Sequence, residues 1–260
     1  MSFFIINSSS ADVCREPDFN SGVVTQALLG ESCEILDHNE NWSFIQQWDN
    51  YEGWVHNFFG VRSETPYNYT HFSYSLSTPL FNKSRSEIVR YIYFNSLLKI
   101  DSDKNGYKVI LPDGIIGWTD DRFHTKHPTP TRDNILKTAE RFLGTPYRWG
   151  GKTPSGMDCS GLVQTVFKSA GVNLPRDAHQ QKEFLKNAQV DLEESETGDL
   201  LFFSENGSVT HVAICTGKMG FINARGWVRK ESLDENAYNF NKKLKSLFCS
   251  AVNVLNLLTA

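Results

Sequence analysis

The segment 145–161, TPYRWGGKTPSGMDCSG, contains the residue best suited to covalent chemistry, Cys159. This Gly- and Pro-rich run passes directly into apolar residues at helical spacing, so Cys159 is expected in the first turn of an amphipathic helix. The free N–H groups and the helix dipole there favour a thiolate, which is a nucleophile. The alternative is a structural cysteine, since free cysteines are often buried. The polar neighbours Asp158 and Ser160 argue against apolar burial.

A cysteine nucleophile needs a base within hydrogen-bond reach, and histidine is the usual one. Among the seven histidines, His211 opens the apolar strand HVAIC directly after a polar turn. A third polar group commonly orients such an imidazole. Asn223 fits that role, because it interrupts the apolar run FINA and needs a partner if buried. The alternative is that neither residue is catalytic: His211 is then an ordinary histidine at a strand end, and Asn223 an asparagine near a turn.

Composition sets the outer limits on function. The 260 residues suit two or three domains, and 40% hydrophobic with 22% charged residues is ordinary for a globular protein. A net charge of −4 gives no electrostatic case for nucleic acid or an anionic membrane, and no apolar run reaches membrane-span length. Phe3 to Ile6 lacks a preceding basic region, so it is interpreted as a strand, not a signal peptide. Five scattered cysteines without a CxxC pair predict neither disulfides nor a metal site, and a cytoplasmic location is expected.

A weak internal repeat divides the first half of the chain. Residues 28–55 parallel residues 94–119, and Trp54 and Trp118 each follow a glycine at matching positions. Short alternating strands broken by polar turns predict a small all-β barrel in each copy. The expected domains are residues 1–62 and 66–125, and the irregular start of the second copy (72–85) leaves its strands undefined. The Pro-containing stretch 124–133 is typical of a linker.

The last half, residues 130–260, changes from helical to strand patterns. Helices are expected over 134–143, from 159 to 171 and over 178–187. From residue 198 onward the pattern is of strands: DLLFF, THVAICTG, GFINARG, WVRKESL and KSLFCSAVNVLNL. Helices followed by a run of antiparallel strands predict an α+β domain.

Residues 133–260 resemble the NlpC/P60 family of cysteine peptidases, which cut bacterial cell-wall stem peptides. The resemblance rests on GTPYRWGGKTPSGMDCSGLV, LPRDA, GDLLFF, THVAICTG and FINA, in that order. It implies a papain-like α+β fold, with Cys159 as nucleophile, His211 as base and Asn223 as the group that orients the base. Many family members have histidine at the third position. The backbone N–H of Cys159 is a reasonable oxyanion donor at a helix start.

The two N-terminal copies resemble bacterial SH3 (SH3b) domains. A chain with two SH3b-like domains before such a peptidase domain resembles the γ-D-glutamyl-L-diamino acid endopeptidases of murein recycling. That resemblance implies that Glu16 and Tyr51, together with Asp158, bind the free amine of the substrate's L-Ala. Carboxylates closed around an ammonium would be left unpaired by a longer or blocked peptide. Otherwise Glu16 is an exposed turn residue and Tyr51 a hairpin aromatic.

The same resemblance places Ser160 and Arg176 on the D-Glu carboxylate, since arginine suits a planar anion. Asp177 then holds Arg176 or touches substrate. The hydroxyl residue expected after Arg-Asp is replaced by Ala178, and His179 is a candidate substitute.

The expected function is therefore a cytoplasmic cysteine endopeptidase that hydrolyses the γ-D-Glu to diamino acid bond of free murein peptides, without metal or organic cofactor. Its partner is the peptide L-Ala-γ-D-Glu-diamino acid. One alternative is an exported hydrolase of intact wall, and another is a catalytically weak protein that binds wall fragments. The identity of the diamino acid, the role of the second copy and the oligomeric state stay open.

Overall fold

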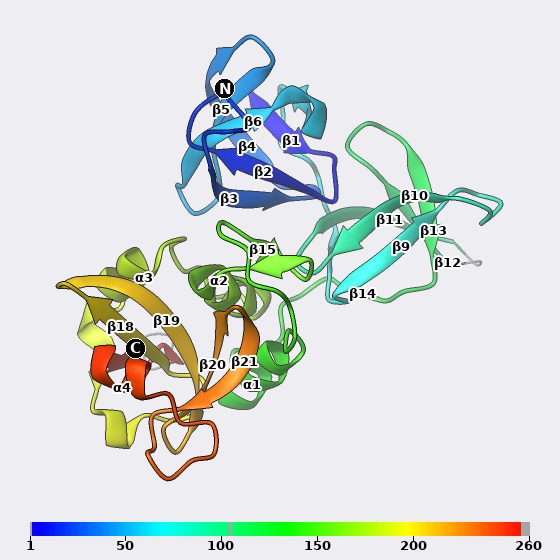
Figure 1. Ribbon diagram of the computed structural model, residues 1–260. Coiled ribbons are helices and arrows are strands. Elements are labelled where there is room, and N and C mark those ends of the chain that lie inside the picture. Colours follow the sequence, from blue (N-terminus) through cyan, green and yellow to red (C-terminus); the bar gives the residue numbers. More distant parts are fainter. Residues whose placement is uncertain (1, 104–105, 256–260) are drawn as a thin grey trace. The chain divides into compact units, whose positions relative to one another are not determined.

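The computed structural model describes residues 2–103 and 106–255. The chain divides into two compact units, residues 1–127 and 128–260, which Figure 1 colours from blue to green and from green to red. Among the described residues, no helix combines the length and apolar character needed to cross a membrane.

The first unit begins with a seven-stranded antiparallel sheet of strand order β3-β2-β6-β5-β4-β1-β7. The expected strand at the N-terminus is confirmed as β1. The strands are β1 (Phe3–Ile6), β2 (Ser10–Cys14), β3 (Val23–Leu28), β4 (Ser32–Asn39), β5 (Trp42–Gln46), β6 (Glu52–His56) and β7 (Gly60–Ser63), with a 3-10 turn, η1 (Asn57–Phe59), before β7.

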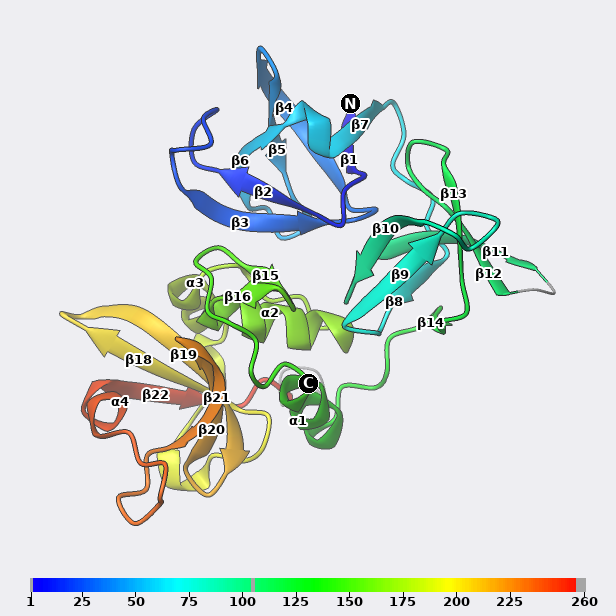
Figure 2. The ribbon, with the colours of Figure 1, turned by 45° about the vertical axis from the view of Figure 1, so that its right-hand side comes forward.

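A second seven-stranded sheet follows with the order β10-β9-β13-β12-β11-β8-β14, which is the first order with every strand shifted by seven (Figure 2). Trp118 pairs with Lys108 as Trp54 pairs with Phe44, so the repeat seen in the sequence extends to strand register. The strands are β8 (His71–Ser73), β9 (Ser77–Phe81), β10 (Ile88–Tyr93), β11 (Leu97–Asp103), β12 (Gly106–Ile110), β13 (Ile116–Thr119) and β14 (Phe123–His124).

Each sheet has its own hydrophobic core. Phe4, Ile6 and Val13 belong to the first core and Leu80 and Leu98 to the second. The second core also contains a fully buried residue from the first repeat, Leu29, which directly follows β3.

The backbone around Leu29 joins the two sheets. The N–H of Leu97 donates to the carbonyl of Leu29 at 2.9 Å. Gly30 follows with φ +81°, and a Cβ there would lie 2.0 Å from the Leu97 carbonyl oxygen. Only glycine fits this close approach. Leu29 and Gly30 therefore couple the two sheets of the first unit.

The second unit packs helices on a six-stranded antiparallel sheet of order β17-β22-β18-β19-β20-β21. Its strands are β17 (Gln189–Val190), β18 (Leu200–Glu205), β19 (Ser208–Gly217), β20 (Gly220–Arg225), β21 (Trp227–Ser232) and β22 (Phe248–Val252), and a short hairpin joins β15 (Lys152–Thr153) to β16 (Gly156–Met157). The helices are α1 (Arg132–Glu140), α2 (Cys159–Ser169), α3 (Ala178–Phe184) and α4 (Lys242–Leu247), with 3-10 turns η2 (Lys186–Ala188) and η3 (Leu192–Glu194).

Helices cover both faces of this sheet. α1, α2 and α3 all contact β19 and lie on one side of the sheet, while α4 packs against β18 on the other side (Figures 1 and 2). Leu201, Phe203 and Leu244 belong to the core on the α4 side. The run LLFF in β18 is buried throughout, which is typical of a strand covered on both faces.

Three sequence expectations differ from this unit. α2 ends at Ser169, before the expected end at residue 171, and its polar face is buried as well as its apolar face. α1 starts at Arg132, two positions before the expected start, because Thr131 accepts from the N–H of Asn134 and caps the helix there. The strand expected from residue 245 starts only at Phe248, because Asn241 caps α4. The end of that expected strand, residues 256–257, lies outside the described residues.

Leu29→Ala should destabilise the first unit by about 2–5 kcal/mol, because it leaves a cavity in the second core. Urea denaturation of the full chain measures the loss in the free energy of unfolding. Leu36→Ala is the control, since Leu36 is 44% exposed and its truncation should change stability by less than about 0.5 kcal/mol. Equal effects of the two substitutions would contradict the coupling of the sheets through Leu29.

Candidate active site

Cys159 is the first residue of α2 and only 8% exposed. Asp158 caps the helix, and its Oδ1 accepts from the N–H of Gly161 at 2.7 Å. A Cβ on Gly161 would lie 2.2 Å from the carbonyl oxygen of Gly151, so the loop before the hairpin presses against the first helical turn. The Gly-rich approach noted in the sequence is thus a packing requirement that fixes the start of α2.

Asp158 is the centre of a buried network. Oδ2 accepts from the N–H of Gly150 at 2.8 Å and from Nη2 of Arg176 at 2.6 Å. Oδ1 accepts from Nη1 of Arg176 at 3.0 Å and from Oγ of Ser160 at 3.3 Å. Arg176 is 1% exposed and also donates to Oγ of Ser160 at 2.9 Å. A buried ion pair is tolerated only when further hydrogen bonds satisfy both charges, as they do here.

This network brings together three residues predicted to bind substrate: Asp158, Ser160 and Arg176. Asp177 is placed differently, as the N-cap residue of α3, where its N–H donates to Oε1 of Gln180 at 3.1 Å. Their contacts to a substrate stay predictions. The structure adds that the Arg176 guanidinium and the Asp158 carboxylate already hold each other.

His211 lies in β19, the strand that α2 contacts. Its Nε2 is 2.9 Å from Oδ1 of Asn223, which is completely buried in β20. Nδ2 of Asn223 donates to Oε2 of Glu231 at 2.9 Å. Because the amide nitrogen is committed to a carboxylate, Oδ1 must face the ring, and Nε2 of His211 must carry the hydrogen. The other ring nitrogen, Nδ1, is then free to accept a proton.

Glu231, in β21, is a residue that sequence reasoning missed. Besides Asn223, its carboxylate accepts from Nδ2 of Asn241 at 2.8 Å and from Nη2 of Arg229 at 3.0 Å. The register of β20 and β21 pairs Asn223 with Arg229, which places Glu231 near the amide. Glu231 is two residues beyond Arg229, the partner of Asn223 in the neighbouring strand. The sequence alone cannot show that Glu231 lies near Asn223, because this requires the register of the two strands.

Burial sets the protonation states of Cys159 and His211. Burial and the charge of Asp158 raise the pKa of the Cys159 thiol to about 11, although the N–H groups of Val212 and Ser160 favour the thiolate. Burial lowers the pKa of His211 to about 4, although the hydrogen bond that its Nε2 donates to Asn223 favours the protonated ring. Both shifts favour the neutral forms, the thiol and the neutral imidazole. Burial thus opposes the thiolate that the helix start favours.

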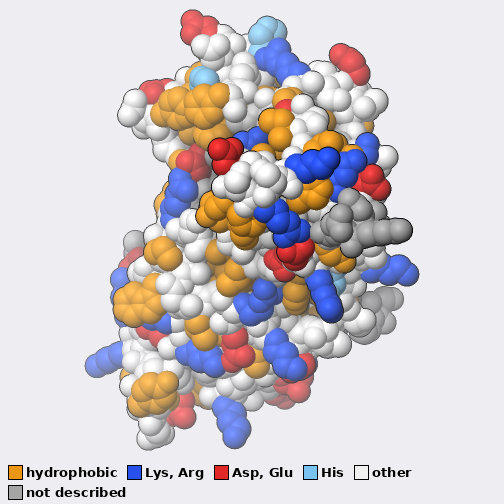
Figure 3. Space-filling view, turned by 90° about the vertical axis from the view of Figure 1, so that its right-hand side faces the viewer, with side chains coloured by type: hydrophobic (Ala, Val, Ile, Leu, Met, Phe, Trp, Pro, Cys, Tyr) orange, Lys and Arg blue, Asp and Glu red, His pale blue; other side chains and the backbone are white. Residues whose placement is uncertain are grey.

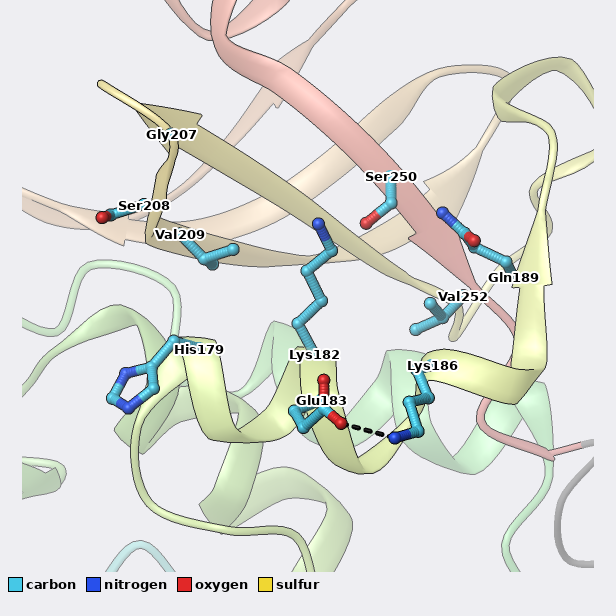
Figure 4. A pocket seen from close by; sticks show the side chains of 10 residues that line it. All are labelled: His179, Lys182, Glu183, Lys186, Gln189, Gly207, Ser208, Val209, Ser250 and Val252. Atoms are coloured by element: carbon cyan, nitrogen blue, oxygen red, sulfur yellow. Dashed lines mark hydrogen bonds and ion pairs between the residues drawn. The ribbon is translucent and has the colours of Figure 1, made fainter.

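Two pockets lie near these elements. One, of about 340 Å³, is lined by His211 and by Tyr147, whose pKa burial raises to about 12. The other, of about 510 Å³, lies between α3 and the β18–β19 turn; Lys182 reaches across it and His179 lies at one end (Figure 4). Within residues 2–103 and 106–255, no group of three His, Cys, Asp or Glu side chains is arranged to hold a metal.

Glu16 and Tyr51 belong to the first unit. Glu16 is exposed in the turn after β2, and its N–H donates to Oγ of Ser21 at 3.1 Å. Tyr51 is half-buried before β6, and its N–H donates to Oδ1 of Asp49 at 3.2 Å. Their predicted role in binding an amine stays a prediction.

Comparison with known proteins matches part of each unit. Residues 144–245 match the model of the NlpC/P60 family, and residues 13–57 match that of the bacterial dipeptidyl-peptidase Sh3 domain. A γ-D-glutamyl-L-lysine dipeptidyl-peptidase of Bacillus cereus is 30% identical over 77% of this chain and 66% of its own length. The chain belongs to the NlpC/P60 family. It is a cysteine peptidase with an SH3-type domain before the catalytic one.

Other relatives extend over most of this NlpC/P60 protein. Dipeptidyl-peptidase 6 of Lysinibacillus sphaericus is 28% identical over 89% of this chain and 92% of its own length. The crystal structure of an NlpC/P60 family protein from B. cereus matches with a TM-score of 0.83 and 25% identity, covering 98% of this chain and 100% of that one. The chain spans about two thirds of the length of the B. cereus dipeptidyl-peptidase.

The neutral state of the pair predicts how Cys159 is alkylated. Since only the thiolate reacts and the pKa is raised to about 11, the rate of alkylation by iodoacetamide should rise tenfold per pH unit from pH 6 to 9. Mass spectrometry of the Cys159 peptide measures this rate. A rate that levels off below pH 7 would indicate a preformed thiolate–imidazolium pair instead.

Glu231→Ala should free the Asn223 amide to rotate and release the His211 tautomer. We expect kcat/KM for peptide hydrolysis to fall on the order of 10-fold or more. ¹⁵N NMR of the imidazole should show the Nε2-protonated tautomer in the wild type and a mixture in the variant. Glu231→Gln keeps one acceptor and should retain more activity, and Glu235→Ala is the control at an exposed position. An unchanged tautomer in Glu231→Ala would contradict the positioning role.

Proposed function

We propose that this protein hydrolyses the γ-D-glutamyl to diamino acid bond of free murein stem peptides that have an unblocked N-terminal L-Ala. The observation that carries the proposal is the hydrogen bond from His211 to Asn223 in an NlpC/P60 domain whose helix α2 starts at Cys159. Two further facts support it: relatives named γ-D-glutamyl-L-lysine dipeptidyl-peptidases, and a matching SH3 model named for bacterial dipeptidyl-peptidases.

In the proposed mechanism, the pair starts neutral. Nδ1 of His211 takes the thiol proton as the Cys159 sulfur attacks the γ-carbonyl carbon, because Nε2 is held by Asn223. The N–H of Cys159 stabilises the oxyanion. The imidazolium then gives its proton to the leaving nitrogen, and the C–N bond breaks to leave a thioester. Water, deprotonated by His211, hydrolyses the thioester and restores the thiol.

The charge changes fit the buried setting. Cys159 is buried, so a thiolate–imidazolium pair of Cys159 and His211 in the resting enzyme would carry a desolvation penalty. A pair that becomes charged only during the attack carries this penalty only transiently. The neighbouring Asp158 carboxylate disfavours a thiolate and favours an imidazolium. It therefore stabilises the charge that His211 acquires once the sulfur has formed its bond to carbon.

Substrate length is set in this proposal by an amine site made of Glu16, Tyr51 and Asp158, and by Ser160 and Arg176 on the D-Glu carboxylate. Both seven-stranded sheets are proposed as SH3b domains, because they share one strand order and one register around Trp54 and Trp118. The C-terminal unit is proposed as papain-like, since a helix that starts at the nucleophile packs on an antiparallel sheet that carries the base.

The reaction is tested by incubating the purified protein with L-Ala-γ-D-Glu-L-Lys and with the meso-diaminopimelate peptide and weighing the products by mass spectrometry. Release of the dipeptide L-Ala-D-Glu identifies the bond. Cys159→Ala should reduce the rate to background while the circular dichroism spectrum stays that of the wild type. Cleavage at a wild-type rate in this variant would refute Cys159 as nucleophile.

The same assay examines the amine site and the two alternative functions. N-acetylation of the L-Ala should sharply reduce cleavage, and equal rates on blocked and free peptides would remove the amine site from the proposal. Efficient cleavage of intact peptidoglycan would favour a wall hydrolase, and binding of fragments without turnover would favour a wall-fragment-binding protein. A cytoplasmic location belongs to the recycling role and is tested by cell fractionation.

A further inference from the structure

The pocket beside His211 has a position and a charge that the mechanism above does not use. Its volume is about 340 Å³, within the range of small-molecule sites. The polar residues of its wall come from the loop before β15, the end of β18, β19, the end of β20 and α4: Tyr147, Glu205, Thr210, His211, Arg225 and Lys243. Ala224, Leu244 and Leu247 supply an apolar side.

The chemistry of the reaction decides which part of the substrate enters this pocket. His211 must give its proton to the leaving nitrogen, so that nitrogen has to come within hydrogen-bond distance of the imidazole. The residue that carries the leaving nitrogen therefore lies beside His211. A pocket lined by His211 is suited to that residue, and its apolar side suits the methylene chain of a diamino acid.

Arg225 is the charged residue of the pocket that has no counter-charge. It ends β20, two residues after Asn223, so both side chains project from the same face of the strand. Lys243 is paired with Glu205 at 3.6 Å. Among residues 2–103 and 106–255, by contrast, no hydrogen bond or ion pair engages the Arg225 guanidinium. Arg225 and His211 line the same pocket, and after burial the charge of Arg225 also lowers the pKa of His211.

We infer that this pocket binds the diamino acid on the leaving side of the scissile bond, and that Arg225 binds a carboxylate of that residue. Guanidinium and carboxylate form paired, charge-assisted hydrogen bonds, and arginine is the side chain best shaped for them. The carboxylate has two possible sources, the α-carboxylate of a C-terminal diamino acid and the distal carboxylate of diaminopimelate. The inference rests on the proposed function, because it takes the diamino acid as the leaving group.

The Glu205–Lys243 pair gives the pocket a second recognition element. Both side chains are at least half exposed, so the pair is weak and can open. Glu205 is then available to the side-chain ammonium that lysine and diaminopimelate share. Arg225 would distinguish peptides by their carboxylates, whereas Glu205 would accept either diamino acid.

The test compares Arg225→Gln with the wild type on four peptides: L-Ala-γ-D-Glu-L-Lys, its C-terminal amide, the meso-diaminopimelate peptide and its α-amide. If Arg225 binds the α-carboxylate, kcat/KM should fall roughly 10- to 100-fold on both acids and stay unchanged on both amides. If it binds the distal carboxylate, only the two diaminopimelate peptides should lose activity. Equal loss on all four peptides, or loss on none, would overturn the inference.

Two controls keep the outcomes separable. Lys242→Gln removes an exposed cation of α4 outside the pocket and should behave as wild type on all four peptides. Product inhibition of the wild type needs no variant: free diaminopimelate or L-lysine should inhibit, and L-lysinamide should inhibit less if the α-carboxylate is bound. If the wild type cleaves none of the four peptides, the proposed function itself has failed. If it cleaves them and Arg225→Gln shows no selective loss, only the role of Arg225 has failed.

Discussion

The buried ion pair between Asp158 and Arg176 is the interaction on which the active-site geometry depends. One carboxylate caps α2 through Gly161, anchors the preceding loop through Gly150 and holds a guanidinium that also fixes Ser160. Each of these contacts restrains a segment next to Cys159. Loss of either charge would leave the other desolvated and unpaired, a large cost that would be felt first at the helix start. The position of the nucleophile is thus set by its neighbours in the chain and by one arginine far from it in sequence.

The same network explains why the thiol is neutral. A helix start normally lowers the pKa of a cysteine, but here the cap that forms the helix start is itself an anion beside a buried sulfur. The residue that positions Cys159 also disfavours its charged form. Arg176 offsets part of the Asp158 charge, and the N–H groups of Ser160 and Val212 offset more, yet burial prevails. The charges of the described residues on the face shown in Figure 3 form no single cluster of this kind. On this face, Lys and Arg side chains are interspersed with Asp and Glu side chains.

Sequence reasoning reached those parts of the protein whose signals are local. The Gly-rich run before Cys159, the strand that contains His211 and the polar Asn223 in an apolar run each carry their information in a few neighbouring residues. The expectation that His211 begins its strand was wrong, because β19 starts at Ser208. The presence of two similar β-domains in the first unit was also predicted, because residues 28–55 and 94–119 share one sequence pattern. α4 was missed because the apolar residues of this short helix continue directly into the strand β22, and the cap that marks the helix, Asn241, lies before its first residue. Glu231 and the engagement of Arg176 by Asp158 depend on register and on contacts distant in sequence, which no local pattern encodes.

Asn223 and Glu231 together suit a base that must start neutral. A carboxylate directly on His211 would hold the ring at the same orientation but would also raise its pKa strongly, since opposite charges in contact favour the imidazolium. The amide transmits orientation with only a partial charge, and Glu231 acts from one residue further away, where its effect on the pKa of His211 is smaller than that of burial or of the Asn223 hydrogen bond. Glu231 instead fixes which end of the amide faces the ring. An asparagine supported by a glutamate can therefore set the tautomer of His211 and still leave it neutral, the state from which it can remove the proton of a thiol that burial also keeps neutral.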